Sequence, residues 1–239
     1  CPFGFWGFKH RIEQTISDEQ KGLTLKIRGH AKPEIIVGYS TDENIGKKIT
    51  DNHLDEIASK FYKNNFKKID TSDTLKKELG KDLDLELLYF YCHGKRVYRD
   101  QKRKKGQKSA YLEIGQGDVI ATNDIDQWKS IWPPNHWKIT QPLIFINGCS
   151  TVDIGPDSIG NLATRFIIEW GASGVIGTET TISPYWAVPA GEVFFERFVK
   201  EKDTIGDSVK QLRLNLLYRG WLIGLGYTAY ASSELKIIP

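Results

Sequence analysis

Two runs of almost uninterrupted apolar residues constrain the fold of this chain more than any other feature. LELLYFYC covers residues 85–92 and PLIFIN covers residues 142–147. Strands that are apolar at nearly every position are typical of a parallel sheet that is buried on both faces. We therefore predict that both runs are inner strands of such a sheet.

Amphipathic segments alternate with these runs and with shorter apolar ones. In residues 53–65, Leu54, Ile57 and Phe61 recur at helical spacing. The predicted helices span 53–65, 74–81, 124–132, 158–171, 184–200 and 203–220, and the further predicted strands span 23–29, 32–41, 66–70, 174–179 and 226–232. The alternation predicts an α/β fold with a mostly parallel sheet covered by helices on both faces. We expect residues 1–31 to be a lead-in segment, and residues 32–239 to form one domain without an internal boundary.

The segment KRVYRDQKRKKGQK (95–108) carries eight Lys or Arg residues against one Asp. It lacks apolar periodicity, so we expect a solvated loop. It could also dock an acidic partner or an RNA backbone, or be a site of self-cleavage. Residues 110–121 predict a hairpin that turns at Gly115-Gln116-Gly117, and Thr122 or Asn123 is expected to cap the helix that follows.

Cysteine usage and hydropathy indicate in which cellular compartment the protein is expected. Three cysteines give no disulfide framework and no Cys-x-x-Cys spacing, which favours a reducing, cytoplasmic setting. No apolar run reaches the 18 residues that a membrane helix needs, and no signal peptide is recognisable, so we expect no membrane partner. The chain contains no methionine, even at position 1, and we interpret it as part of a longer protein.

Both long apolar runs stop abruptly at residues whose side chains or backbone groups could take part in a reaction. The first ends at Cys92-His93-Gly94, and the second is followed by Gly148-Cys149. Ligands of open parallel sheets bind where strands end at their carboxyl termini. If the two strands are neighbours, His93 and Cys149 converge in one crevice although 56 positions separate them in the sequence.

A cysteine and a histidine together supply a nucleophile and a base. The imidazole can take the thiol proton during attack on a carbonyl and can later protonate the leaving amine. The N–H groups of Gly94 and Cys149 are candidate donors to the oxyanion. Cys92 and His93 point to opposite sides of a strand and cannot easily share an ion, so we predict neither a metal site nor a cofactor.

The chain resembles CHAT domains, a bacterial branch of the caspase-like cysteine peptidases, over residues 33–232. The motifs that carry the resemblance are FYCHG (90–94), YLEIGQGDVIATNDI (111–125), LIFINGCST (143–151) and the segment 170–213. It implies a caspase-like three-layer sandwich, a Cys149–His93 dyad, an oxyanion hole from Gly94 and Cys149, no metal, and cleavage of peptide bonds.

Around the nucleophile the chain departs from the caspase pattern Gln-Ala-Cys-x-Gly, because INGCST stands there. In relatives the residue two positions before the cysteine lines the specificity pocket. Here that residue is Asn147, which is neutral, so no strong preference for a basic residue is predicted from it. Asp153 and Glu179, in loops at strand ends, are candidate sources of negative charge in a substrate-binding pocket.

We therefore predict a thiol protease that cleaves a protein substrate and is regulated by fused domains or by a partner. Two alternatives remain open at this point. One is a non-catalytic interaction module with the same fold, and the other is a nucleic-acid-binding domain that uses the basic segment 95–108.

Overall fold

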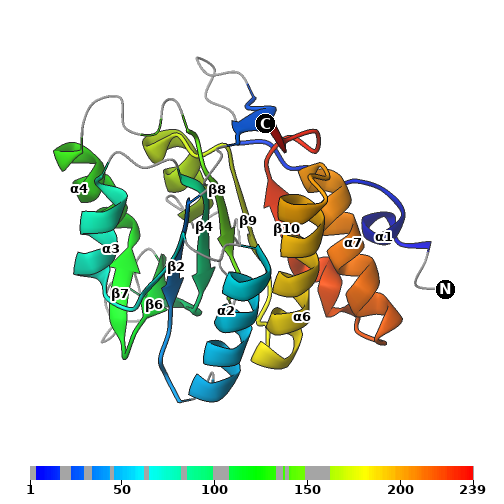
Figure 1. The fold of residues 1–239 in the computed structure, drawn as a ribbon, viewed down its shortest axis with the longest axis horizontal. Helices are drawn as coiled ribbons and strands as arrows, with labels where there is room; N and C mark the ends of the chain where they lie inside the picture. The colour runs from blue at the N-terminus through cyan, green and yellow to red at the C-terminus, as the bar shows by residue number, and fades with distance from the viewer. Residues whose placement is uncertain are drawn as a thin grey trace.

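A six-stranded sheet forms the centre of the fold (Figure 1). The structure is a computed structural model, and it describes residues 4–16, 23–29, 34–43, 46–61, 65–81, 85–98, 108–132, 137, 140–148 and 162–238. The strand order of the sheet is β10-β9-β8-β4-β2-β3. The strands are β2 (Glu34–Tyr39), β3 (Phe66–Ile69), β4 (Leu85–Tyr91), β8 (Leu143–Ile146), β9 (Gly174–Thr178) and β10 (Tyr227–Tyr230). All adjacent pairs are parallel except β9 with β10, which confirms the mostly parallel sheet.

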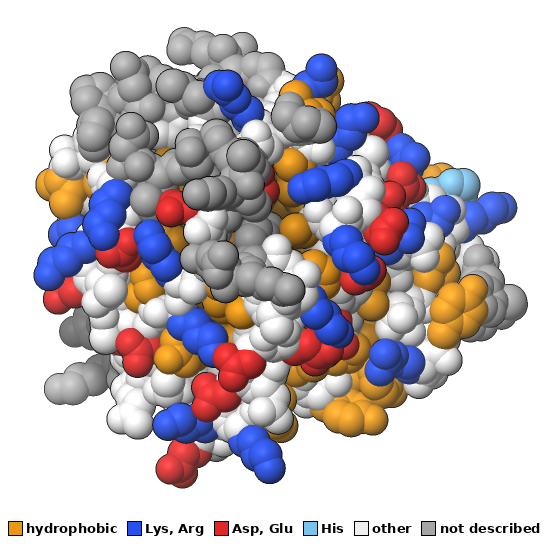
Figure 2. Space-filling model, viewed as in Figure 1, with side chains coloured by type: hydrophobic (Ala, Val, Ile, Leu, Met, Phe, Trp, Pro, Cys, Tyr) orange, Lys and Arg blue, Asp and Glu red, His pale blue; other side chains and the backbone are white. Residues whose placement is uncertain are grey.

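One face of the sheet is covered by α2 (Lys47–Phe61), α6 (Pro184–Phe194) and α7 (Ile205–Tyr218) (Figure 1). Helix α6 continues as the π-helical segment η3 (Phe195–Lys200). Apolar residues such as Leu54, Phe194 and Leu212 bury one side of each helix against the sheet. Figure 2 shows Lys and Arg side chains interspersed with Asp and Glu across this view, with hydrophobic side chains between them.

The opposite face is covered by α3 (Ser72–Leu79), α4 (Thr122–Ile131), α5 (Leu162–Thr164) and the π-helical segment η2 (Arg165–Trp170). Gly171, at φ 80°, ends η2 in the left-handed conformation that glycine adopts without strain, which confirms the predicted helix end. The predicted cap of α4 was wrong. The N-cap position is Ala121, and Asp124 Oδ2 accepts a hydrogen bond from its N–H group at 2.7 Å.

A separate antiparallel sheet consists of β5 (His93–Tyr98), β6 (Lys108–Ile114) and β7 (Asp118–Ala121). The turn between β6 and β7 confirms the predicted hairpin. The prediction of a loop from residue 95 onward was wrong for residues 95–98, which pair with β6. Basic residues suit this position because β5 is an edge strand, and edge strands commonly carry Lys and Arg. Residues 99–107 lie outside the described part of the chain.

The lead-in segment packs against the domain. It contains α1 (Trp6–Lys9) and β1 (Lys26–Arg28), which confirms a strand within 23–29. Strand β1 pairs in parallel with β11 (Lys236–Ile238), and a 3₁₀ helix, η4 (Leu222–Gly226), precedes β10. Ile27 is fully buried, and Arg11 pairs with Asp207 and Glu234. Within the described ranges, no helix combines the length and apolarity needed to cross a membrane.

Candidate active site

Strands β4 and β8 lie side by side, which meets the condition for His93 and the residues after β8 to converge. Their parallel register runs from Leu87 opposite Leu143 to Phe90 opposite Ile146. One residue further along, the Asn147 N–H group donates a 2.8 Å hydrogen bond to the Phe90 carbonyl. The polar residues that follow both strands therefore leave the same edge of the sheet.

His93 begins β5 two residues after β4 ends, and its side chain is 21% exposed. Its Nε2 atom lies 3.2 Å from Asp42 Oδ2. Asp42 follows β2, the neighbour of β4 on the other side from β8. Asp42 was not identified from the sequence.

The loop that carries Asp42 is fixed by backbone and side-chain hydrogen bonds. Ser40 N–H donates to the Tyr91 carbonyl at 3.0 Å, and Thr41 N–H donates to the Gly115 carbonyl at 2.8 Å. The Ser40 hydroxyl accepts from the Asp42 N–H group at 3.2 Å. These contacts tie the loop both to the end of β4 and to the β6–β7 turn, so Asp42 is held beside His93 by the fold.

The other residues of the predicted catalytic group are described in part. Gly94 lies in β5, opposite Leu112 of β6. Gly148, which precedes the predicted nucleophile, is held through its carbonyl, which accepts a hydrogen bond from the Thr178 hydroxyl of β9. Cys149 and Asp153 lie outside the described residues.

His93 and Gly148 border a cavity of about 280 Å³ at this edge of the sheet. Tyr91 and Asn147 contribute to it from the strand ends, and Ile182 and Ala187 line it from the segment that enters α6. Burial raises the pKa of Tyr91 above its ordinary value, so its phenol is neutral. The predicted base and the backbone that leads into the predicted nucleophile therefore border the same cavity.

Asn147 lies at the centre of a buried hydrogen-bond network and is 2% exposed. Its Nδ2 atom donates to the Tyr89 hydroxyl at 2.9 Å and to the Ala187 carbonyl at 2.8 Å. Its Oδ1 atom accepts from the Tyr227 hydroxyl at 2.7 Å. The amide thus links β8 to β4, β10 and α6.

His53 of α2 extends this network, because its Nε2 atom lies 2.9 Å from the Tyr89 hydroxyl. Burial lowers the pKa of His53 to about 4, and the nearby Glu56 opposes that shift only in part. Burial also raises the pKa of Tyr89 well above its ordinary value. At neutral pH all members of the network are therefore uncharged.

Glu179 is exposed just after β9, and it is not among the described residues that line the cavity. Its Oε1 atom accepts hydrogen bonds from the Thr228 hydroxyl at 2.9 Å and the Tyr230 hydroxyl at 3.4 Å, both on β10. Its predicted contribution of charge to a substrate pocket stays a prediction. No cluster of three or more His, Cys, Asp or Glu residues suited to a metal ion occurs among the described residues.

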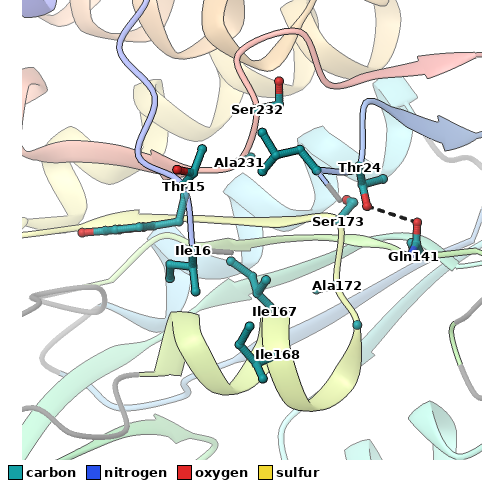
Figure 3. Close-up of a pocket in the computed structure, with 13 residues that line it drawn as sticks. Thr15, Ile16, Thr24, Gln141, Ile167, Ile168, Ala172, Ser173, Ala231 and Ser232 are labelled. Carbon is teal, nitrogen blue, oxygen red and sulfur yellow. Dashed lines mark hydrogen bonds between the residues drawn. The ribbon is translucent and has the colours of Figure 1, made fainter. Parts of the chain in front are cut away.

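A second cavity, of about 250 Å³, lies at the opposite end of the sheet. Figure 3 shows Gln141, which precedes β8, and Ser173, which precedes β9, beside it. The Thr24 hydroxyl of the lead-in segment donates to Gln141 Oε1 at 3.2 Å (Figure 3). Because this cavity lies at the amino ends of the strands, it is separate from the polar strand ends around His93.

No family model matches the chain. A probable protease of Vitiosangium sp. (strain GDMCC 1.1324) is 30% identical to it over an alignment 255 positions long, which covers 99% of this chain. The chain spans only 30% of the length of that relative.

Solved cysteine proteases share the fold at low sequence identity. The Arg-specific cysteine proteinase gingipain R superposes with a TM-score of 0.59 at 11% identity, over 86% of this chain and 47% of gingipain. The Drosophila initiator caspase Dronc superposes with a TM-score of 0.51 at 11% identity, over 94% of this chain and 91% of Dronc. Separase from Saccharomyces cerevisiae, in complex with securin, superposes with a TM-score of 0.51 at 14% identity, over 90% of this chain and 13% of the matched chain. These likenesses confirm the predicted caspase-like α/β sandwich.

Proposed function

We propose that this chain is a cysteine endopeptidase domain in which Cys149 attacks and His93 transfers protons. The observation that carries the proposal is that His93 and Gly148 border one cavity at the carboxyl ends of two adjacent parallel strands. Similarity to a probable protease and to the fold of cysteine proteases supports the same reaction class.

The proposed reaction begins when the Cys149 thiol loses its proton to His93 and attacks the carbonyl carbon of a peptide bond. Because Nε2 of His93 lies toward Asp42, the other ring nitrogen, Nδ1, is the one available to the thiol. The C–N bond then breaks as the imidazolium protonates the leaving amine, and a thioester remains. Water, deprotonated by the same imidazole, hydrolyses the thioester and restores the thiol.

Backbone N–H groups of Gly94 and Cys149 are the proposed donors to the oxyanion that forms in both steps. Asp42 is proposed to stabilise the imidazolium that exists between the two proton transfers, because its carboxylate lies 3.2 Å from the ring. In this proposal the carboxylate beside Nε2 leaves Nδ1 for the nucleophile.

The test is cleavage of a peptide library by the purified chain, with products identified by mass spectrometry. Cys149→Ala and His93→Ala should each abolish cleavage. Cys1→Ala and His10→Ala are matched controls and should retain it. His10 is exposed, caps the C-terminus of α1 and is not among the residues that line the cavity. Full activity of Cys149→Ala would refute the proposal.

The CHAT relationship and regulation by fused domains or a partner belong to this proposal as well. Control of the activity by other parts of a longer polypeptide is consistent with the length of the probable protease, of which this chain spans only 30%. Comparing the activity of the isolated chain with that of the longer protein would test such control. The use of residues 95–108 by nucleic acid stays a prediction, since residues 99–107 lie outside the described part.

A further inference from the structure

We propose that the cavity beside His93 receives the substrate side chain that precedes the cleaved bond, and that it selects an uncharged, mainly apolar side chain. This inference rests on the proposed function. The cavity of about 280 Å³ is at or just below the range of about 300–1,000 Å³ found for whole small-molecule sites, so it suits a single side chain.

The position of the cavity links it to the reacting carbonyl. His93 and Gly148 lie on its border, and Gly148 immediately precedes the proposed nucleophile. In this proposal, a peptide carbonyl that is attacked next to Gly148 and His93 brings the side chain of the same residue to the mouth of the cavity.

The described walls are predominantly apolar. Ile182 and Ala187 are each 4% exposed, and Pro184 lies between them at the start of α6. Tyr91, the last residue of β4, and Cys92, which follows it, line the cavity on the side of that strand. Burying an apolar side chain against such walls is favourable by about 25 cal/mol for each Å² removed from water.

No Asp, Glu, Lys or Arg is present among the described residues that line the cavity. Asn147 is not available as a substitute, because both its amide nitrogen and its oxygen are bonded to Tyr89, Ala187 and Tyr227. A substrate Arg or Lys would therefore lose water without meeting an opposite charge on the described walls, and burial of an unpaired charge is strongly unfavourable.

The N-terminus of α6 does not provide an anion site either. Pro184 has no N–H group, and the Tyr185 N–H group donates to the Ser183 hydroxyl at 3.3 Å. The N–H groups of Trp186 and Ala187 donate to the Ser183 carbonyl at 2.9 Å and 3.0 Å. A substrate Asp or Glu would thus find these helix donors already engaged, and an uncharged side chain is favoured over both signs of charge.

The test uses peptidyl chloromethyl ketones that differ only in the residue next to the reactive group: Leu, Phe, Arg, Lys, Asp or Glu. Rates of covalent labelling of Cys149 are followed by intact mass and peptide mapping. We expect the Leu and Phe reagents to label at least about 100-fold faster than the charged ones, as expected where a charge is buried without a partner.

Faster labelling by the Arg, Lys, Asp or Glu reagents would overturn the inference while leaving the proposed peptidase intact. Labelling of Cys149 by none of the reagents, together with absence of cleavage in the peptide library, would overturn the proposed function itself. The two failures are therefore distinguishable.

A variant pair sharpens the test. Thr181 lies on the exposed rim of the cavity. Thr181→Asp should raise the labelling rate of the Arg reagent relative to the Leu reagent by at least about tenfold, because it adds a counter-charge at the entrance. Thr181→Asn has nearly the same shape without the charge and should leave the ratio unchanged. Equal ratios in the two variants would show that the side chain binds elsewhere.

Discussion

His53 should make the stability of this domain fall as the pH is lowered from about 6.5 to about 4. Its ring lies between α2 and the sheet, 1% exposed, with Nε2 beside the Tyr89 hydroxyl. Burial lowers its pKa from 6.5 to about 4. The unfolded chain therefore binds a proton in this pH range that the folded chain excludes.

The size of the effect follows from linkage. Each pKa unit corresponds to about 1.4 kcal/mol, so a shift of this size contributes about 3 kcal/mol to the pH dependence of the free energy of unfolding. That contribution is fully present above pH 6.5, where both states are neutral. It is lost progressively as the pH falls toward the folded-state pKa, since protonation then draws the chain toward the unfolded state.

Urea unfolding followed by tryptophan fluorescence, at several pH values between 7.5 and 4.5, measures this dependence. Other groups also titrate in the range, so the informative quantity is the difference between the unmodified chain and His53→Gln, which cannot titrate. The variant should lose less stability on acidification, by up to about 3 kcal/mol. His10→Gln, at an exposed position, is the control. Identical pH slopes for His53→Gln and the unmodified chain would refute the argument.

Three further substitutions test other contacts. Tyr227→Phe removes the hydroxyl that donates to the buried Asn147 oxygen and should lower the free energy of unfolding, measured by urea unfolding, by about 1–3 kcal/mol. Tyr185→Phe, at a 68% exposed site, should change it by less than about 0.5 kcal/mol. Gly38→Ala would place a methyl group 2.7 Å from the Phe90 ring and should cost about 1–3 kcal/mol in the same assay. Asp42→Asn should lower kcat on a cleaved peptide at least about tenfold while thermal stability changes little, and unchanged kcat would exclude the proposed role.

The central architecture could be predicted from the sequence because its signals are local. Continuous apolar runs identified β4 and β8 as inner strands, and the parallel-sheet rule predicted a common edge for the residues after them. The turn residues at 115–117 likewise identified the β6–β7 hairpin. The π-helical segments η2 and η3 leave no comparable signal, since their apolar spacing also fits an α-helix.

Asp42 was missed because its significance depends on strand order. A polar residue after β2 is ordinary in a sequence, and only the placement of β2 beside β4 brings its carboxylate to His93. The internal bonding of Asn147 was also invisible, because its partners come from β4, β10 and α6, which are distant in the sequence. Contacts among several separate elements follow from tertiary packing, for which a single sequence gives little indication.

The bonding of Asn147 also limits how specificity could change over evolutionary time. Aspartate at this position is one nucleotide substitution away from asparagine in the genetic code, yet it would turn an oxygen toward the Ala187 carbonyl in place of the donated N–H group. The new charge would be buried as well, at a site that is 2% exposed. If selection favoured cleavage after basic residues, the single-nucleotide change Asn147→Asp would thus destabilise the folded domain. Changes at the solvent-facing rim, such as Thr181, would offer a path that leaves folding intact.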